Sequence, residues 1–94
     1  MEAISVTAIL KPKEQLAERL LEELQKVQKA SRQETGCLDY TLHQSIEDET
    51  FVLHEKWQDM DALESHIASS HYEEYRNNIA ELVSAREVYK LKVL

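Results

Sequence analysis

Two neighbouring segments in the middle of the chain alternate between apolar and polar residues with a period of two. In residues 37–45 and 50–57, the large side chains fall on alternate positions: Leu38, Tyr40 and Leu42, then Phe51, Leu53, Glu55 and Trp57. This period is typical of β-strands whose two faces meet different surroundings. The short polar stretch at residues 46–49 predicts that the two strands form a hairpin.

Glu55 departs from this pattern, because it shares its parity with three large apolar side chains. A carboxylate on a buried strand face costs several kcal/mol (roughly) unless it is paired or protonated. The helical spacing that follows the second strand places His66 on the apolar side of its segment, beside Leu63. An acid and an imidazole that point into one interior indicate a pocket.

The remaining segments complete a β-α-β-β-α-β order. Residues 3–10 alternate with apolar character on both parities, which predicts a strand covered on two sides. Pro12 ends this strand and suits the first turn of a helix over residues 13–32, whose apolar stripe is Leu16, Leu20, Leu24 and Val27. Gly36, the only glycine, predicts the turn out of this helix.

Two capping signals and a final alternation follow. Asp59 is a candidate cap for a short helix, and Ser70 with Glu73 forms a candidate capping box for another. Residues 86–94 alternate again and predict a fourth strand. The order predicts an α+β, ferredoxin-like sheet with helices on one face. Because Val6, Val52 and Val88 look too apolar for open solvent, we expect a homodimer to cover the other face.

Length and charge narrow the function classes. The 94 residues predict a single domain over residues 1–94. The net charge of −7 argues against nucleic acid and anionic membranes as partners. The N-terminus lacks the basic residues of a signal peptide, and no segment approaches the length of a membrane span. One cysteine, Cys37, suits a reducing cytoplasm and is expected to be structural.

An ordered set of residues resembles a known family. The set is the turn Glu34-x-Gly36-Cys37-Leu38-x-Tyr40, the strand end Glu55-x-Trp57, and Ala62-Leu63-x-x-His66 followed by His71. Together they resemble the antibiotic biosynthesis monooxygenase superfamily, and most closely its small quinol-monooxygenase-type members. The resemblance implies a dimeric α/β barrel. It also implies oxidation of a phenolic substrate by O₂ without metal, flavin or haem.

The resemblance assigns His66 to the position of the histidine that lines the family pocket, as a base toward a phenolic hydroxyl. We expect Glu55 to orient His66, and Trp57 to stack on an aromatic substrate. Further possible lining residues are Tyr40, His71, Tyr72 and Tyr75. Each also has a plain structural interpretation. Glu55 could be an acid salt-bridged in the sheet or at a dimer seam, and the aromatic residues could be core. His66 could be a satisfied core or half-exposed residue, and His71 could be exposed.

Other chemistries fit less well. His66 and His71 are five residues apart, whereas two ligands on one helical face are three or four apart, and the chain has no Gly-rich phosphate loop. The haem-degrading branch of the superfamily relies on a strand-one asparagine and a tryptophan near the position of His66, and this chain has neither. The alternatives are a non-catalytic dimeric module for small-molecule binding or stress response, or a signal-molecule-processing relative.

Overall fold

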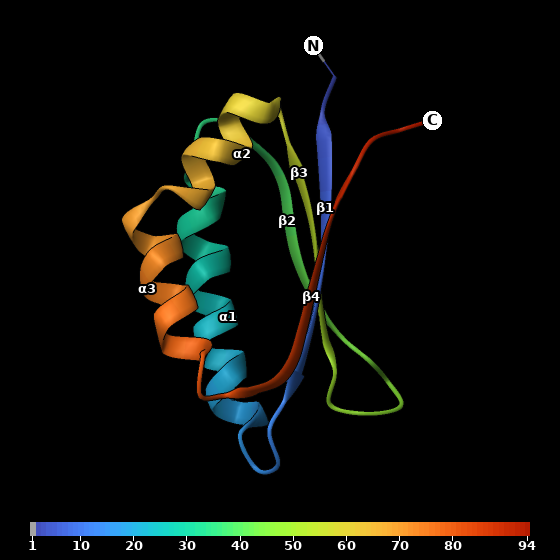
Figure 1. The fold of residues 1–94 in the computed structure, drawn as a ribbon, viewed down its shortest axis with the longest axis vertical. Coiled ribbons are helices and arrows are strands. Elements are labelled where there is room, and N and C mark those ends of the chain that lie inside the picture. Colours follow the sequence, from blue (N-terminus) through green and yellow to red (C-terminus); the bar gives the residue numbers. More distant parts are fainter. Residues whose placement is uncertain (1) are drawn as a thin grey trace.

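The computed structural model describes residues 2–94, which form four strands and three helices (Figure 1). Their order along the chain is β1 (Ile4–Pro12), α1 (Ala17–Arg32), β2 (Cys37–Gln44), β3 (Phe51–Trp57), α2 (Met60–Ile67), α3 (Ser70–Ile79) and β4 (Val83–Leu91). Helices α2 and α3 follow one another almost directly, so together they occupy the place of the second helix in the expected β-α-β-β-α-β order.

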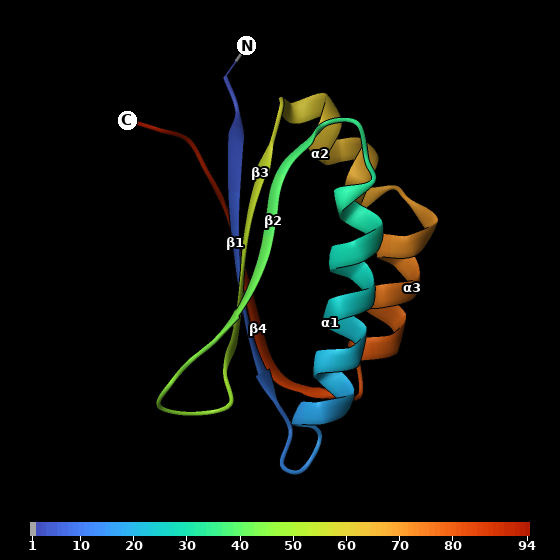
Figure 2. The ribbon, with the colours of Figure 1, turned by 180° about the vertical axis from the view of Figure 1, so that it is seen from behind.

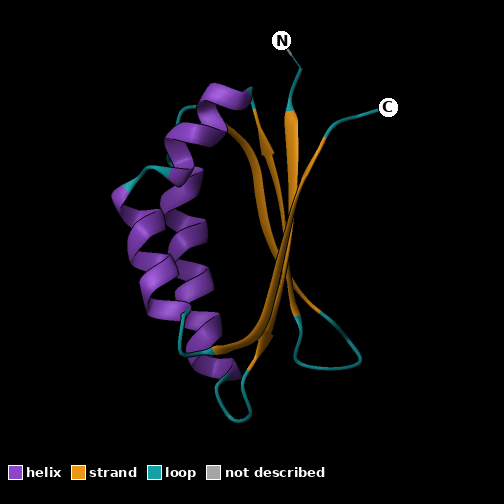
Figure 3. Cartoon of the chain, in the orientation of Figure 1, coloured by secondary structure: helices purple, strands orange, loops and turns teal. Residues whose placement is uncertain are grey.

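The strands form one antiparallel sheet in the order β2-β3-β1-β4. All three helices cover the same face of this sheet, and the other face carries none (Figures 2 and 3). The expected α+β ferredoxin-like fold is therefore confirmed. No helix among residues 2–94 is both long enough and apolar enough to cross a membrane.

The core lies between the sheet and the helices, as the periodicity predicted. Phe51, Leu53, Glu55 and Trp57 all point from β3 toward the helices and are buried. The α1 stripe packs above them through its buried residues Leu20, Leu24 and Val27.

Leu38 differs from the expectation. It shares the parity of Tyr40, yet 55% of its surface is exposed. The register explains the difference, because Cys37 pairs with Trp57 and Asp39 already pairs with Lys56, which inserts a bulge between them. A bulge places one extra residue in a strand and reverses the facing of the side chains before it.

The segment boundaries also move. Helix α1 begins at Ala17 rather than at residue 13, and Gln15 adopts a left-handed conformation with φ of 68° before it. Asp59 caps α2 as expected, its side chain accepting from Ala62 N. The cap of α3 is Ser69 rather than Ser70, and β4 spans Val83–Leu91 rather than residues 86–94.

Gly36 serves a different purpose from the one expected. Its φ is not positive, so it does not end α1 through a left-handed turn. Instead it lies against α2, where a Cβ atom on residue 36 would overlap the Cβ of Ala62. The carbonyl of Gly36 also accepts a hydrogen bond of 2.8 Å from Gln58 N. These contacts fix the loop between α1 and β2 against the start of α2.

The apolar residues used to predict a dimer do not all lie on the helix-free face. Val6 is 4% exposed and belongs to the core, and Val88 pairs with buried Ala8, so both face the helices. Val52 does lie on the helix-free face, opposite Ile9. Tyr89 and Leu91 lie on that face too, with exposed fractions of 49% and 44%.

Candidate functional site

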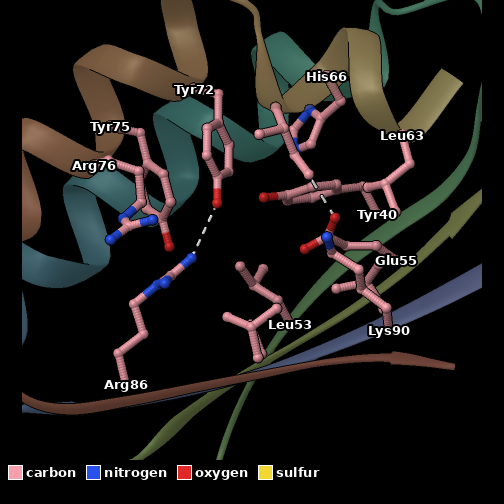
Figure 4. A pocket seen from close by; sticks show the side chains of 14 residues that line it. Tyr40, Leu53, Glu55, Leu63, His66, Tyr72, Tyr75, Arg76, Arg86 and Lys90 are labelled. Carbon is pink, nitrogen blue, oxygen red and sulfur yellow. Dashed lines mark hydrogen bonds and ion pairs between the residues drawn. The ribbon is translucent and has the colours of Figure 1, made fainter. Parts of the chain in front are cut away.

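A cavity of about 240 Å³ lies between the sheet and helices α2 and α3 (Figure 4). Strands β1, β3 and β4 form its floor through apolar side chains such as Val6, Leu53 and Val88. Tyr40, Tyr72 and Tyr75 form aromatic walls, as the sequence predicted. The cavity exceeds the roughly 150 Å³ known to hold a benzene molecule, so a single substituted ring fits within it.

His66 is buried at the wall of this cavity, with only 1% of its surface exposed. Its Nδ1 lies 2.7 Å from Glu34 Oε2. An ionised carboxylate can only accept, so the ring proton lies on Nδ1 and Nε2 carries a free lone pair. His66 Nε2 is a buried atom without a hydrogen-bond partner.

Glu34 is the main functional candidate that the sequence interpretation missed. The same Oε2 atom that binds His66 also lies 2.8 Å from His71 Nε2, so one carboxylate joins α2 to α3. Glu34 lies in the loop that Gly36 fixes against Ala62. A signal was available, since this acid lies two residues before the only glycine in the chain.

Glu55 makes no direct hydrogen bond to His66, the residue that we expected it to orient. It is buried, with 7% of its surface exposed, and its Oε1 accepts a hydrogen bond of 3.0 Å from Trp57 Nε1. The distance from Glu55 Oε1 to His66 Nε2 is 3.9 Å, too long for a hydrogen bond. Strand parity did bring the two groups to one cavity, but Glu34 holds the imidazole.

The surroundings shift both titrating groups toward their neutral forms. Burial raises the pKa of Glu55 to about 7, and the charge of Glu34 adds to this, while the Trp57 hydrogen bond and the charge of Arg86 oppose it. Burial lowers the pKa of His66, although the hydrogen bond and charge of Glu34 act in the opposite direction. Near neutral pH, His66 is therefore an unprotonated group that can accept a proton at Nε2.

Trp57 and His71 lie behind the cavity wall rather than on it. Trp57 is fully buried, and its ring lies 4.3 Å from that of His66, centroid to centroid, at an angle of 32°. It packs against the imidazole and donates a hydrogen bond to Glu55. It does not line the cavity. Glu34 links His71 to His66 through its Oε2 atom.

Strand β4 contributes basic side chains that the sequence interpretation did not single out. Arg86 and Lys90 line the cavity together with Arg76 of α3. Arg86 Nη2 donates a hydrogen bond of 3.0 Å to the hydroxyl of Tyr72. The alternation of Arg86, Val88 and Lys90 in the sequence was the available signal, because β4 lies beside β1 and presents this parity to the helices.

A family model described as antibiotic biosynthesis monooxygenase matches residues 3–78. The chain belongs to this family. It is 35% identical over 83 residues to "Putative monooxygenase YcnE" of Bacillus subtilis, and the match spans 87% of each chain.

Solved structures of similar proteins share the fold. The structure of PA3566 from Pseudomonas aeruginosa has a TM-score of 0.94 at 30% identity, with 100% of this chain and 96% of that chain covered. Rv0793 from Mycobacterium tuberculosis also gives a TM-score of 0.94 at 30% identity, covering 99% of this chain and 96% of the other.

In this family member, one cluster has the composition of a metal site. Glu34, His66 and His71 place one ligating atom each within 4.8 Å of one another. The spacing argument against a shared site does not apply, because His66 lies in the last turn of α2 and His71 in the first turn of α3. The two close contacts, 2.7 and 2.8 Å, have the lengths of charge-assisted hydrogen bonds. Each histidine N–H is satisfied by Glu34 without an ion.

Proposed function

We propose that this protein is a cofactor-independent monooxygenase that oxidises a quinol or a related phenol with O₂. The observation that carries the proposal is the free Nε2 of His66, buried at the wall of an aromatic cavity and backed by a carboxylate on the opposite ring nitrogen. Family membership supports a monooxygenase-like function, and the relatives YcnE and Rv0793 carry that word in their names.

The first step is removal of a proton from the substrate. A phenolic hydroxyl directed at His66 Nε2 gives its proton to the imidazole and becomes a phenolate. Glu34 then stabilises the imidazolium through the 2.7 Å contact at Nδ1. Glu55, with its pKa raised to about 7, is half neutral near that pH, so it opposes the substrate anion less than an ordinary carboxylate would.

The electrons come from the substrate. For a hydroquinone, the ring loses four electrons to O₂. One oxygen atom becomes a new ring hydroxyl, the other leaves as water, and the product is a hydroxyquinone. The share of the chain is to create the electron-rich anion and to hold it in a cavity with apolar walls.

Oxygen uptake tests this function directly. The purified protein is incubated with a panel of quinols and polyphenols in an oxygen electrode, and ¹⁸O₂ is used to follow the oxygen atom into the product. We expect uptake above the spontaneous rate and one labelled oxygen per product ring. If bound substrates are never consumed, the protein is a binding module.

A homodimer formed through the helix-free sheet face is part of the same proposal. Ile9, Val52, Tyr89 and Leu91 give this face its apolar character. An exposed apolar face of this kind is typical of an interaction surface. Sedimentation at micromolar concentration should give about twice the monomer mass of 11.0 kDa. A stable folded monomer under these conditions would contradict the dimer.

A further inference from the structure

The cavity concentrates positive charge in an acidic protein. The chain has a net charge of −7, with 18 acidic and 11 basic residues. Among the residues that line the cavity, however, Arg76, Arg86 and Lys90 are basic, and Glu55 is the single acid. A cavity with walls of one predominant sign attracts ligands of the opposite sign. The lining therefore favours an anionic ligand over a neutral one.

Arg86 is the most constrained of these cations. Its Nε is buried and has no hydrogen-bond partner, although Nη2 donates to Tyr72. Among residues 2–94, no acidic side chain lies within ion-pair distance of Arg86. A half-buried guanidinium with an orphaned N–H loses part of its hydration, and Glu55, the one acid in the cavity, does not form an ion pair with it. A carboxylate on a ligand would supply both the charge and the acceptor, since a guanidinium edge and a carboxylate match in geometry.

Arg86 and His66 approach the cavity from different ends. In Figure 4, Tyr72 and Tyr40 lie between His66 on one side and Arg86 on the other. A ring held between these aromatic side chains can direct one substituent to His66 Nε2 and another to Arg86. The cavity volume of about 240 Å³ leaves room for one such ring or for two fused rings.

We propose that the cavity binds a hydroxylated aromatic carboxylate, with the hydroxyl at His66 and the carboxylate at Arg86. The assignment of the hydroxyl end rests on the proposed function. The carboxylate end rests on Arg86 alone. The substrate class is thereby narrowed from quinols in general to phenolic or quinolic acids.

Calorimetric titration of 4-hydroxybenzoate and 4-hydroxybenzamide tests the carboxylate end. The two probes have nearly the same shape, and the titrations are made without O₂, so binding is measured without turnover. We expect the acid to bind at least about tenfold more tightly than the amide, because a charge-assisted hydrogen bond shielded from bulk water is stronger than a neutral one. Equal affinities, or no binding of either probe at millimolar concentration, would overturn the proposal.

Variants assign the preference to Arg86. Arg86→Gln should reduce the difference between the acid and the amide to within about twofold. Arg86→Lys, which keeps the charge but loses the paired donors, should retain only part of it. Arg19→Gln on the exposed surface of α1 is the matched control and should bind as wild type does. Thermal melting checks folding, and Arg86→Lys decides the question if Arg86→Gln does not fold. A full preference retained without Arg86 would contradict the assignment.

The proposed function and this inference can fail separately. Oxygen uptake with a neutral hydroquinone, together with no preference for the acid, would leave the monooxygenase proposal standing and remove the carboxylate site. A preference for the acid that depends on Arg86, without uptake of oxygen for any quinol or quinolic acid, would leave the carboxylate site standing and remove the monooxygenase proposal.

Discussion

The four histidines of the chain form two pairs on opposite faces of the sheet, and the two pairs differ in burial and in their polar partners. His66 and His71 lie on the helix side, with ring centroids 6.0 Å apart and a shared carboxylate, Glu34, between them. His43 and His54 lie on the helix-free face with ring centroids 5.0 Å apart, and both are exposed. The polar contact of His54 there is the hydroxyl of Thr7, at 3.2 Å.

The difference shows how burial and a carboxylate partner prepare a histidine to act as a base. Water screens the exposed pair, so neither ring is held in one tautomer by a buried charge. Burial of His66 removes water, and the carboxylate then decides which nitrogen carries the proton. Variants of the exposed pair therefore serve as controls for variants of the buried pair, provided that sedimentation shows the same assembly as wild type, because the helix-free face also carries the proposed dimer contact.

Replacing His66 by alanine should have the largest effect on turnover. His66→Ala removes the proposed base, and kcat for oxygen uptake should fall by ~10²-fold or more. His54→Ala should change kcat by less than about twofold, because that side chain lies on the other face of the sheet. Circular dichroism confirms that both variants are folded. Equal losses in the two variants would remove the distinction between the pairs.

Replacing Glu55 should change how stability depends on pH. In the folded protein its pKa is raised from 4.5 to about 7, so its stability contribution is complete below pH 4.5 and is lost as pH rises through 7. Wild type should therefore lose up to about 3 kcal/mol, relative to Glu55→Gln, between pH 5 and pH 8. The lowered pKa of His66 acts oppositely, adding stability as pH rises toward 6.5, and cancels in this difference.

Urea unfolding at several pH values measures this difference, since the glutamine can still accept the hydrogen bond from Trp57. Glu64→Gln, on the exposed side of α2, is the control and should follow wild type at each pH. Parallel curves for wild type and Glu55→Gln would mean that Glu55 stays ionised throughout.

The parts of the site that could be predicted from the sequence depend on local periodicity. Glu55 shares a strand face with large apolar residues, so strand parity predicts that it points into the core. Helical spacing predicts the same for His66. Both side chains line the same cavity. The same rule failed at Leu38, because a bulge breaks the period and no residue type announces it.

The missed residues depend on contacts between distant segments. Glu34 reaches His66 across 32 positions of the chain, and only the packing of the loop on α2 brings them together. Arg86 faces the cavity because β4 pairs with β1, which joins the two ends of the sequence. Glu55 is the inward-facing acid nearest to His66 in sequence, but Glu34 is the acid that binds it.

A side chain at residue 36 should lower the stability of the protein, because Gly36 packs directly against α2 on the side of the buried histidine pair. In Gly36→Ala the new Cβ would overlap Ala62 Cβ, which belongs to a helix and cannot rotate away. We expect a loss of about 2 kcal/mol in the free energy of unfolding. Ala62→Gly removes the obstructing atom at a cost of about 1 kcal/mol. The double variant should therefore be as stable as Ala62→Gly alone, and additive losses would contradict the overlap.

The two partners of His66 should shift its titration in opposite directions, by the smallest amounts in this series. The charge of Glu34 raises the pKa of His66, whereas that of His71 lowers it. Glu34→Gln should therefore move the acid limb of the kcat/KM profile to lower pH and reduce kcat roughly tenfold, since it removes a charged hydrogen-bond partner. His71→Ala should move the limb slightly to higher pH, with only a few-fold change in kcat. His43→Ala should leave the limb in place, because that ring lies on the helix-free face. Shifts of the same sign for Glu34→Gln and His71→Ala would mean that the acid limb belongs to a group other than His66.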